Sequence, residues 1–204
     1  MNRKGILSKV WLALAAIVIG LIGTGEVSQG DLTRLFRSLN QALQSEAPRD
    51  TGRGGRPGEV LAGRPRIIDG DTLDVDGVRV RMQGIDALEH DQECRGGNGR
   101  FECGAAARQA LVELIGGRSV TCVPDGSTTH GRSVAHCSVP RPGGGTLDLN
   151  EAMVRSGYAF DCPRFSDGRY AAAEAAAKRE KAGAWAGRFD YPWSHRKRSG
   201  ACDR

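Results

Sequence analysis

The sequence predicts an α+β fold, on three observations. Short alternating apolar segments with glycine-rich corners come first, as expected for antiparallel strands joined by tight turns. Segments with helical spacing come later, between and after further strands, rather than in the strict alternation of a parallel sheet. The composition of the 204 residues, 39% hydrophobic and 26% charged, is typical of one globular domain with additions and excludes a disordered chain.

The N-terminus has the features of an export segment. Arg3, Lys4 and Lys9 precede an uncharged apolar run over residues 10–25, slightly shorter than the roughly 18 residues of a typical membrane span. Positive charge before such a run keeps the N-terminus in the cytoplasm and directs the rest across the membrane. We therefore predict that residues 1–26 are a signal peptide or a membrane anchor. No Ala-x-Ala cleavage site follows the run, which favours the anchor, whereas cleavage would give a secreted protein.

Residues 27–58 are predicted to connect this segment to the main domain. Apolar residues at helical spacing over residues 31–43 predict a short helix, which lies on the membrane, pairs with another chain or acts only as a spacer. Residues 45–58 lack bulky apolar side chains and are rich in Gly, Pro and Arg, which is typical of a flexible tether. We expect the domain at residues 59–194 and a basic tail at residues 195–204.

An acidic stretch opens the predicted domain. Alternating apolar residues on both sides of Asp76-Gly77 predict a hairpin, because Asp-Gly between such runs favours a two-residue turn. Asp71 precedes the first strand, Arg81 ends the second, and Asp86 and Glu89 follow closely. An arginine and three carboxylates are therefore expected at one edge of the sheet. Oxygen ligands of this kind suit calcium, which tolerates irregular geometry.

The remaining elements follow from the same patterns. Two apolar segments around Cys122 and Cys137 are expected to pair as antiparallel strands, with residues 128–132 between them. Three helices are predicted by their apolar spacing, with Gly183 capping the last: residues 104–115, 148–156 and 170–182. The aromatic run near the C-terminus is expected to pack in the core rather than to stack on bases: Trp185, Phe189, Tyr191 and Trp193.

The chain has six cysteines, an even number that suits an exported protein with oxidised thiols. The insert between residues 89 and 104 is polar and glycine-rich, so we expect it to lack a core of its own. Other connectivities stay open, and a zinc site is disfavoured because no Cys-x-x-Cys pair exists. The pairing that we put forward as a hypothesis is Cys94 with Cys103, Cys122 with Cys137, and Cys162 with Cys202.

Three separated motifs give the sequence a resemblance to a known family. They are Ile68 to Thr72 (IDGDT), Arg81 to Glu89 (RMQGIDALE) and His130 to Arg132 (HGR). In this order they resemble the staphylococcal nuclease-like (thermonuclease) domain, over roughly residues 60–193. Leu88 stands where that family has proline, and Thr128 and His130 stand where it commonly has Asp and Tyr. The resemblance implies a five-stranded OB-type β-barrel with about three packed helices.

The resemblance also implies the role of each acidic residue. Asp71 and Asp86 would ligate Ca²⁺ through their carboxylates, with the main-chain carbonyl of Ala87 as a further ligand. Glu89 would orient or deprotonate the attacking water. These assignments give the acidic stretch a metal-binding part and a catalytic part.

The basic residues of the motifs receive roles in the same way. Arg81 and Arg132 would bind the phosphate oxygens, for which a planar fork of donors suits better than lysine. His130 is a candidate substrate contact. The net charge of +5 favours an acidic partner such as nucleic acid.

The sequence therefore predicts an exported, calcium-dependent endonuclease acting on DNA, RNA or both and leaving 3′-phosphate ends. Its domain would lie outside the cytoplasm, tethered to the membrane if the N-terminal segment is uncleaved. The alternative is a catalytically weak OB module that binds nucleic acid or protein at the membrane.

Overall fold

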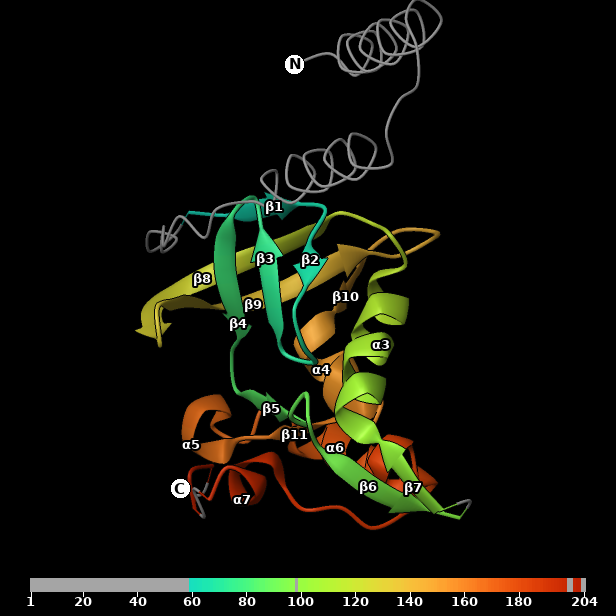
Figure 1. Ribbon diagram of the computed structural model, residues 1–204. Helices are drawn as coiled ribbons and strands as arrows, with labels where there is room; N and C mark the ends of the chain where they lie inside the picture. Colours follow the sequence, from blue (N-terminus) through green and yellow to red (C-terminus); the bar gives the residue numbers. More distant parts are fainter. Residues whose placement is uncertain (1–58, 98, 198–199, 203–204) are drawn as a thin grey trace, which may run out of the picture. The chain divides into compact units, whose positions relative to one another are not determined.

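The computed structural model describes residues 59–97, 99–197 and 200–202 (Figure 1). The predicted export segment at residues 1–26 and the predicted connection at residues 27–58 lie outside this range, so both stay predictions. Within the described range, no helix combines the length and the apolar character needed to cross a membrane.

The main sheet is mixed but largely antiparallel, and the fold is α+β, as predicted. Its strands follow the order β1-β8-β9-β4-β3-β2, with β10 added to β9, and only β4 and β9 run parallel. The strands are β1 (Leu61–Gly63), β2 (Arg66–Ile67), β3 (Thr72–Val75), β4 (Val78–Met82), β8 (Val120–Thr129), β9 (Arg132–Pro140) and β10 (Thr146–Asp148).

This sheet is OB-like without being closed by hydrogen bonds across the described residues. Its two end strands, β1 and β2, belong to one chain segment and are separated only by Arg64 and Pro65. Pro65 has no N–H to donate, so it interrupts the strand, and the segment passes from β8 at one edge to β3 at the other. The sheet accordingly counts seven strands instead of the expected five.

The predicted hairpin at Asp76-Gly77 is confirmed as β3–β4. Asp76 (φ 52°) and Gly77 (φ 79°) both have positive φ, as a tight two-residue turn requires. The antiparallel register sets Thr72 opposite Arg81, which brings the start of β3 and the end of β4 to one edge. Asp71 and Arg81 are thereby neighbours in space.

All three predicted helices are present: α3 (Cys103–Ile115), α4 (Leu149–Arg155) and α6 (Ala171–Glu180). Helix α3 packs beside β2, and α4 packs against β9 (Figure 1). The predicted cap at Gly183 is wrong, because Lys181 takes the left-handed conformation and closes α6 two residues earlier. Gly183 instead begins a 3₁₀ turn (Gly183–Ala186), where a Cβ would lie 2.5 Å from the Ser156 carbonyl oxygen.

A second core lies around Phe160. The aromatic run packs on this ring, with Phe189 stacked at 5.0 Å and Trp185 edge-on at 5.5 Å between ring centroids. The prediction of core docking is therefore confirmed. Leu88, at the position of the family's proline, is buried in this cluster. Two short strands lie here, β5 (Ile85–Ala87) and β11 (Ala159–Asp161), and they pair antiparallel.

The insert after Glu89 packs on the second core through its cysteines, which is compatible with the prediction that it has no core of its own. It folds into a hairpin of β6 (Glu93–Gly96) and β7 (Gly99–Glu102). Cys94 and Cys103 close this hairpin as a disulfide and are buried in the second core, which polar and glycine content alone did not reveal. The other disulfides also join the pairs put forward from the sequence, Cys122 with Cys137 and Cys162 with Cys202.

Helix α3 approaches the chain at Glu89 so closely that only glycine fits. A Cβ on Gly104 would lie 1.7 Å from the Glu89 carbonyl oxygen. We predict that Gly104→Ala lowers the free energy of unfolding by about 2 kcal/mol or more, although alanine in a helix normally stabilises by about 1 kcal/mol. Urea unfolding measures this change.

The matched control for that experiment is Gly97→Ala, because a Cβ there would meet nothing within 4 Å. It should leave the free energy of unfolding within about 0.5 kcal/mol of wild type. A Gly104→Ala protein as stable as wild type would show that α3 does not constrain the backbone of Glu89.

Candidate active site

The site is organised by Arg81, whose guanidinium lies between two buried carboxylates. Its Nη1 donates to Asp71 Oδ1 at 2.5 Å, and its Nη2 donates to Asp86 Oδ1 at 2.6 Å. The side chains of Asp71 and Asp86 are only 3% and 2% exposed. Hairpin β3–β4 supplies Asp71 and Arg81, and β5 supplies Asp86, so the motif residues converge where these strands meet.

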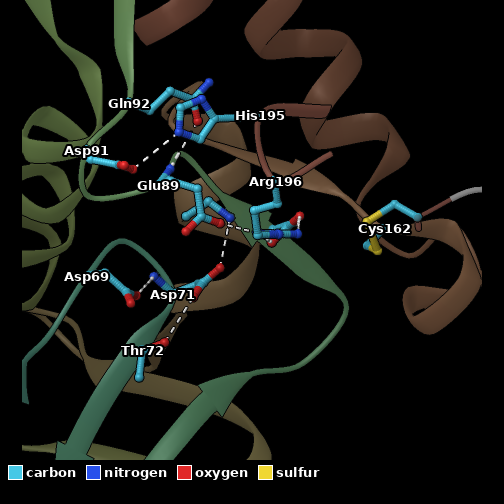
Figure 2. A network of polar contacts seen from close by, with 12 residues as sticks. Asp69, Asp71, Thr72, Glu89, Asp91, Gln92, Cys162, His195 and Arg196 are labelled. Atoms are coloured by element: carbon cyan, nitrogen blue, oxygen red, sulfur yellow. Dashed lines mark hydrogen bonds and ion pairs between the residues drawn. A yellow bond between two sulfur atoms is a disulfide. The ribbon is translucent and has the colours of Figure 1, made fainter. Parts of the chain in front are cut away.

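The Asp71 side chain and its backbone N–H are held by several neighbouring groups. Besides Arg81, the Thr72 hydroxyl donates to its Oδ1 at 3.1 Å and the Ala87 N–H donates to its Oδ2 at 2.8 Å. Its own N–H donates to Asp69 Oδ1 at 3.0 Å, which forms the corner before β3 (Figure 2). Burial raises the pKa of Asp71 above its ordinary value, while the charge of Arg81 opposes this shift. Asp71 is thus a fixed buried carboxyl beside the site.

Glu89 follows β5 and has a rigid backbone with a more accessible side chain. Its N–H donates to Gln92 Oε1 at 3.1 Å, and the buried Gln92 in turn donates through Nε2 to the Asp190 carbonyl at 2.6 Å. The Glu89 side chain is 30% exposed. Its carboxylate can therefore meet solvent or substrate from a defined position.

Arg132 is the first residue of β9 and contacts Thr72, the residue next to Asp71. Its Nη1 donates to Thr72 Oγ1 at 3.4 Å and its Nε donates to the Thr129 carbonyl at 3.3 Å. Burial, with the neighbouring charge of Arg81, lowers the pKa of Arg132 from its ordinary value. His130 is exposed in the hairpin turn just before it, with a φ of 49°.

Arg196 is a site residue that the sequence analysis missed, having assigned residues 195–204 to a basic tail. Its Nη1 donates to Asp86 Oδ1 at 3.1 Å and its Nη2 donates to Asp86 Oδ2 at 2.5 Å. The same Nη1 also donates to Glu89 Oε1 (Figure 2). Burial lowers the pKa of Arg196, but its bonds to Asp86 and Glu89 outweigh this effect and raise it overall. The predicted Cys162–Cys202 pair was the one sequence signal that this tail returns to the domain.

A cleft of ≈ 1190 Å³ joins these residues. The hairpin β8–β9 borders it on one side, and the short helix α5 (Pro163–Ser166) with the C-terminal segment borders it on the other. Asp71 is not among the described residues that line it. The site residues facing the cleft are Arg81, Asp86, Glu89, His130, Arg132 and Arg196.

Calcium suits this donor set in kind, since Asp71, Asp86 and Glu89 offer hard carboxylate oxygens. In the arrangement of this structure those oxygens accept hydrogen bonds from arginine, and the described residues contain no group of three or more His, Cys, Asp or Glu placed to hold a metal. The N–H of Ala87 bonds Asp71. The ligand role of its carbonyl stays a prediction. The carboxylates therefore suit calcium in kind, and withdrawal of Arg196 would free Asp86 Oδ2, the oxygen that Arg81 does not contact, for a cation.

Comparison with known proteins agrees with this geometry. A family model described as "Staphylococcal nuclease homologue" matches residues 79–187, a stretch that contains Arg81, Asp86, Glu89 and Arg132. The chain is also 35% identical over 129 residues to "Succinoglycan biosynthesis protein ExoI" of Rhizobium meliloti (strain 1021). This alignment covers 62% of the chain and 65% of that relative's length.

The buried position of Arg81 leads to a stability prediction. We expect Arg81→Gln to lower the free energy of unfolding by about 3 to 5 kcal/mol, because it leaves Asp71 and Asp86 buried without their shared counter-charge. Arg100→Gln is the matched control, since Arg100 pairs with Glu93 at 3.2 Å and both side chains are more than half exposed, so its loss should cost less than about 1 kcal/mol. Equal losses in urea unfolding would show that Arg81 does not compensate the buried carboxylates.

Proposed function

The chain belongs to the staphylococcal nuclease homologue family, and on that premise we propose that it is a calcium-dependent phosphodiesterase cleaving DNA, RNA or both. One observation carries the proposal. The two arginines of the family motifs, Arg81 and Arg132, and the carboxylates of Asp86 and Glu89 line a single cleft. A phosphodiester needs charge compensation and a positioned base, and this cleft offers both.

The arginines would bind the scissile phosphate. The contacts of Arg132 to Thr72 and Thr129 are long, 3.4 Å from Nη1 to Thr72 Oγ1 and 3.3 Å from Nε to the Thr129 carbonyl, so its guanidinium can turn to a phosphate at little cost. Arg81 is held between Asp71 and Asp86 and would present a fixed positive charge from the other side. Donors that are in place before reaction stabilise the charge that develops on the phosphate oxygens.

Glu89 would hold the attacking water and accept its proton. As the water oxygen bonds to phosphorus, the bond from phosphorus to the 5′-oxygen breaks with its electron pair going to that oxygen, which takes a proton from solvent in the open cleft, and Glu89 afterwards releases its proton to solvent. The products are a 3′-phosphate and a 5′-hydroxyl. The link from the Glu89 backbone through Gln92 to Asp190 supports this role, because a general base must keep its position.

Asp71 and Asp86 would hold the calcium, with the carbonyl of Ala87 as the family resemblance implies. Bound there, calcium would neutralise phosphate charge and polarise the phosphoryl oxygen. The three disulfides support the further proposal that the domain acts outside the cytoplasm, where thiols stay oxidised.

A second candidate is a module that keeps the fold and binds a polyanion without cleaving it. It is favoured by the contacts of Arg196 to both oxygens of Asp86. These contacts would have to break before Asp86 could hold calcium. The similarity to a protein named for succinoglycan biosynthesis extends the possible polyanions to acidic polysaccharides. The two candidates differ in whether any bond is broken.

Digestion of single-stranded DNA and RNA by the oxidised full chain tests the proposal. We expect cleavage with calcium, none with a calcium chelator, and a rate about 10²-fold or more lower in Glu89→Gln, which cannot accept the proton. Glu93→Gln is the matched control, because Glu93 is 58% exposed and pairs with Arg100 in the hairpin. Its rate should equal that of wild type.

The opposite result would identify the second candidate. If wild type and Glu89→Gln were equally inert but both retained the nucleic acid at low salt, where phosphate contacts are strongest, the chain would be a binding module.

A further inference from the structure

We propose that Arg196 competes with the cation for Asp86, so that calcium binding and the withdrawal of this arginine are linked. The inference rests on the proposed function, because the cation concerned is that of the same site. It adds a residue that lies beyond the stretch matched by the family model, which ends at residue 187.

The contacts of Arg196 use the acceptor positions of Asp86 that face the cleft. Asp86 Oδ2 accepts from Arg196 Nη2, and Asp86 Oδ1 accepts from both Arg196 Nη1 and Arg81 Nη2. One guanidinium thus spans both oxygens of a carboxylate that is 2% exposed, in the planar two-bond geometry that makes arginine–carboxylate pairs strong. Its further contact to Glu89 ties the proposed base to the same group.

A divalent cation cannot join this arrangement. Calcium lies about 2.3 to 2.6 Å from its oxygen ligands, which is the distance at which the Arg196 nitrogen already approaches Asp86 Oδ2. Asp86 already accepts from both Arg81 and Arg196, and a divalent cation would add two more positive charges at a buried carboxylate, where little water is present to screen the repulsion. Occupation by calcium therefore requires the guanidinium to leave.

Arg196 is held so that its side chain, rather than the whole tail, is the part that moves. It directly follows α7 (Pro192–His195), where His195 Nε2 lies 3.2 Å from Asp91 Oδ1. Beyond it, the Cys162–Cys202 disulfide fixes the chain, and the Arg164 N–H donates to the Cys202 carbonyl. Backbone anchors on both sides leave a side chain that is 29% exposed and borders the open cleft.

The cleft gives the displaced guanidinium a place to go. Turned away from Asp86, it would stay beside the path of a polyanion and could pair with a phosphate. A bound oligonucleotide would then favour withdrawal, and by linkage it would raise the calcium affinity of wild type. Arg196 thus compensates the carboxylate charge of the resting site. When the cation binds, the arginine guanidinium pairs with a phosphate of the substrate instead.

Calcium binding to the oxidised full chain, measured by titration calorimetry, tests the inference. Arg196→Gln should lower the Kd for calcium about tenfold or more, since it removes the competitor and leaves a buried charge on Asp86. The Kd of Arg196→Lys should lie between those of wild type and Arg196→Gln, because lysine keeps the positive charge but lacks the planar pair of N–H donors. The matched control is Lys197→Gln, which removes one exposed charge from the next position and should change the Kd by less than about twofold. Circular dichroism checks that each variant folds.

The results separate this inference from the proposed function. Tighter binding in Arg196→Gln but not in Lys197→Gln supports the competition, even if wild type cleaves no nucleic acid, in which case only the nuclease proposal fails. An unchanged or weaker calcium Kd in folded Arg196→Gln overturns the competition, even if wild type is an active nuclease. Absence of calcium binding in all four proteins also overturns it.

Discussion

The pairing of Arg81 with two buried carboxylates is the interaction on which the site and its surroundings depend. Asp71 and Asp86 are both almost inaccessible to solvent, and a buried carboxylate without a counter-charge costs several kcal/mol. The turn at Asp76-Gly77 sets the register that puts Arg81 beside Asp71, and β5 then returns Asp86 to the other arm of the guanidinium. Charge compensation and strand pairing therefore require the same geometry.

The site lies where two cores meet. The main sheet carries Arg81 and Arg132, whereas Glu89 and Arg196 belong to the part of the chain that packs around Phe160. The junction is short: Ala87 donates to Asp71, and Leu88, next along the chain, is buried among the aromatic rings. The rigidity that the family obtains from proline at this position has a counterpart here in the packing of Leu88, the disulfide-closed hairpin and the link from Glu89 to Gln92.

The C-terminal segment is part of the site rather than an appendage. Arg196 adds a third guanidinium to a cluster that already holds Arg81 and Arg132, so the acidic residues face arginine on several sides. Such a cluster is suited to a polyanionic ligand, because the positive groups are in place and need little reorganisation to meet phosphate or sugar-acid oxygens.

The sequence by itself determined the features that depend on neighbouring residues. These are the Asp-Gly hairpin, the helical segments, and the motif residues, whose types and order in the chain identify the family. The tertiary structure decided the rest. Lys181 ends α6 in the left-handed conformation, with its N–H donating to the Ala177 and Lys178 carbonyls. The disulfide anchors the polar insert to the second core, and Arg196 reaches Glu89 across 107 residues of sequence. No local pattern encodes that last contact, because a buried charge selects its partner by position in the folded chain and not by distance along the sequence.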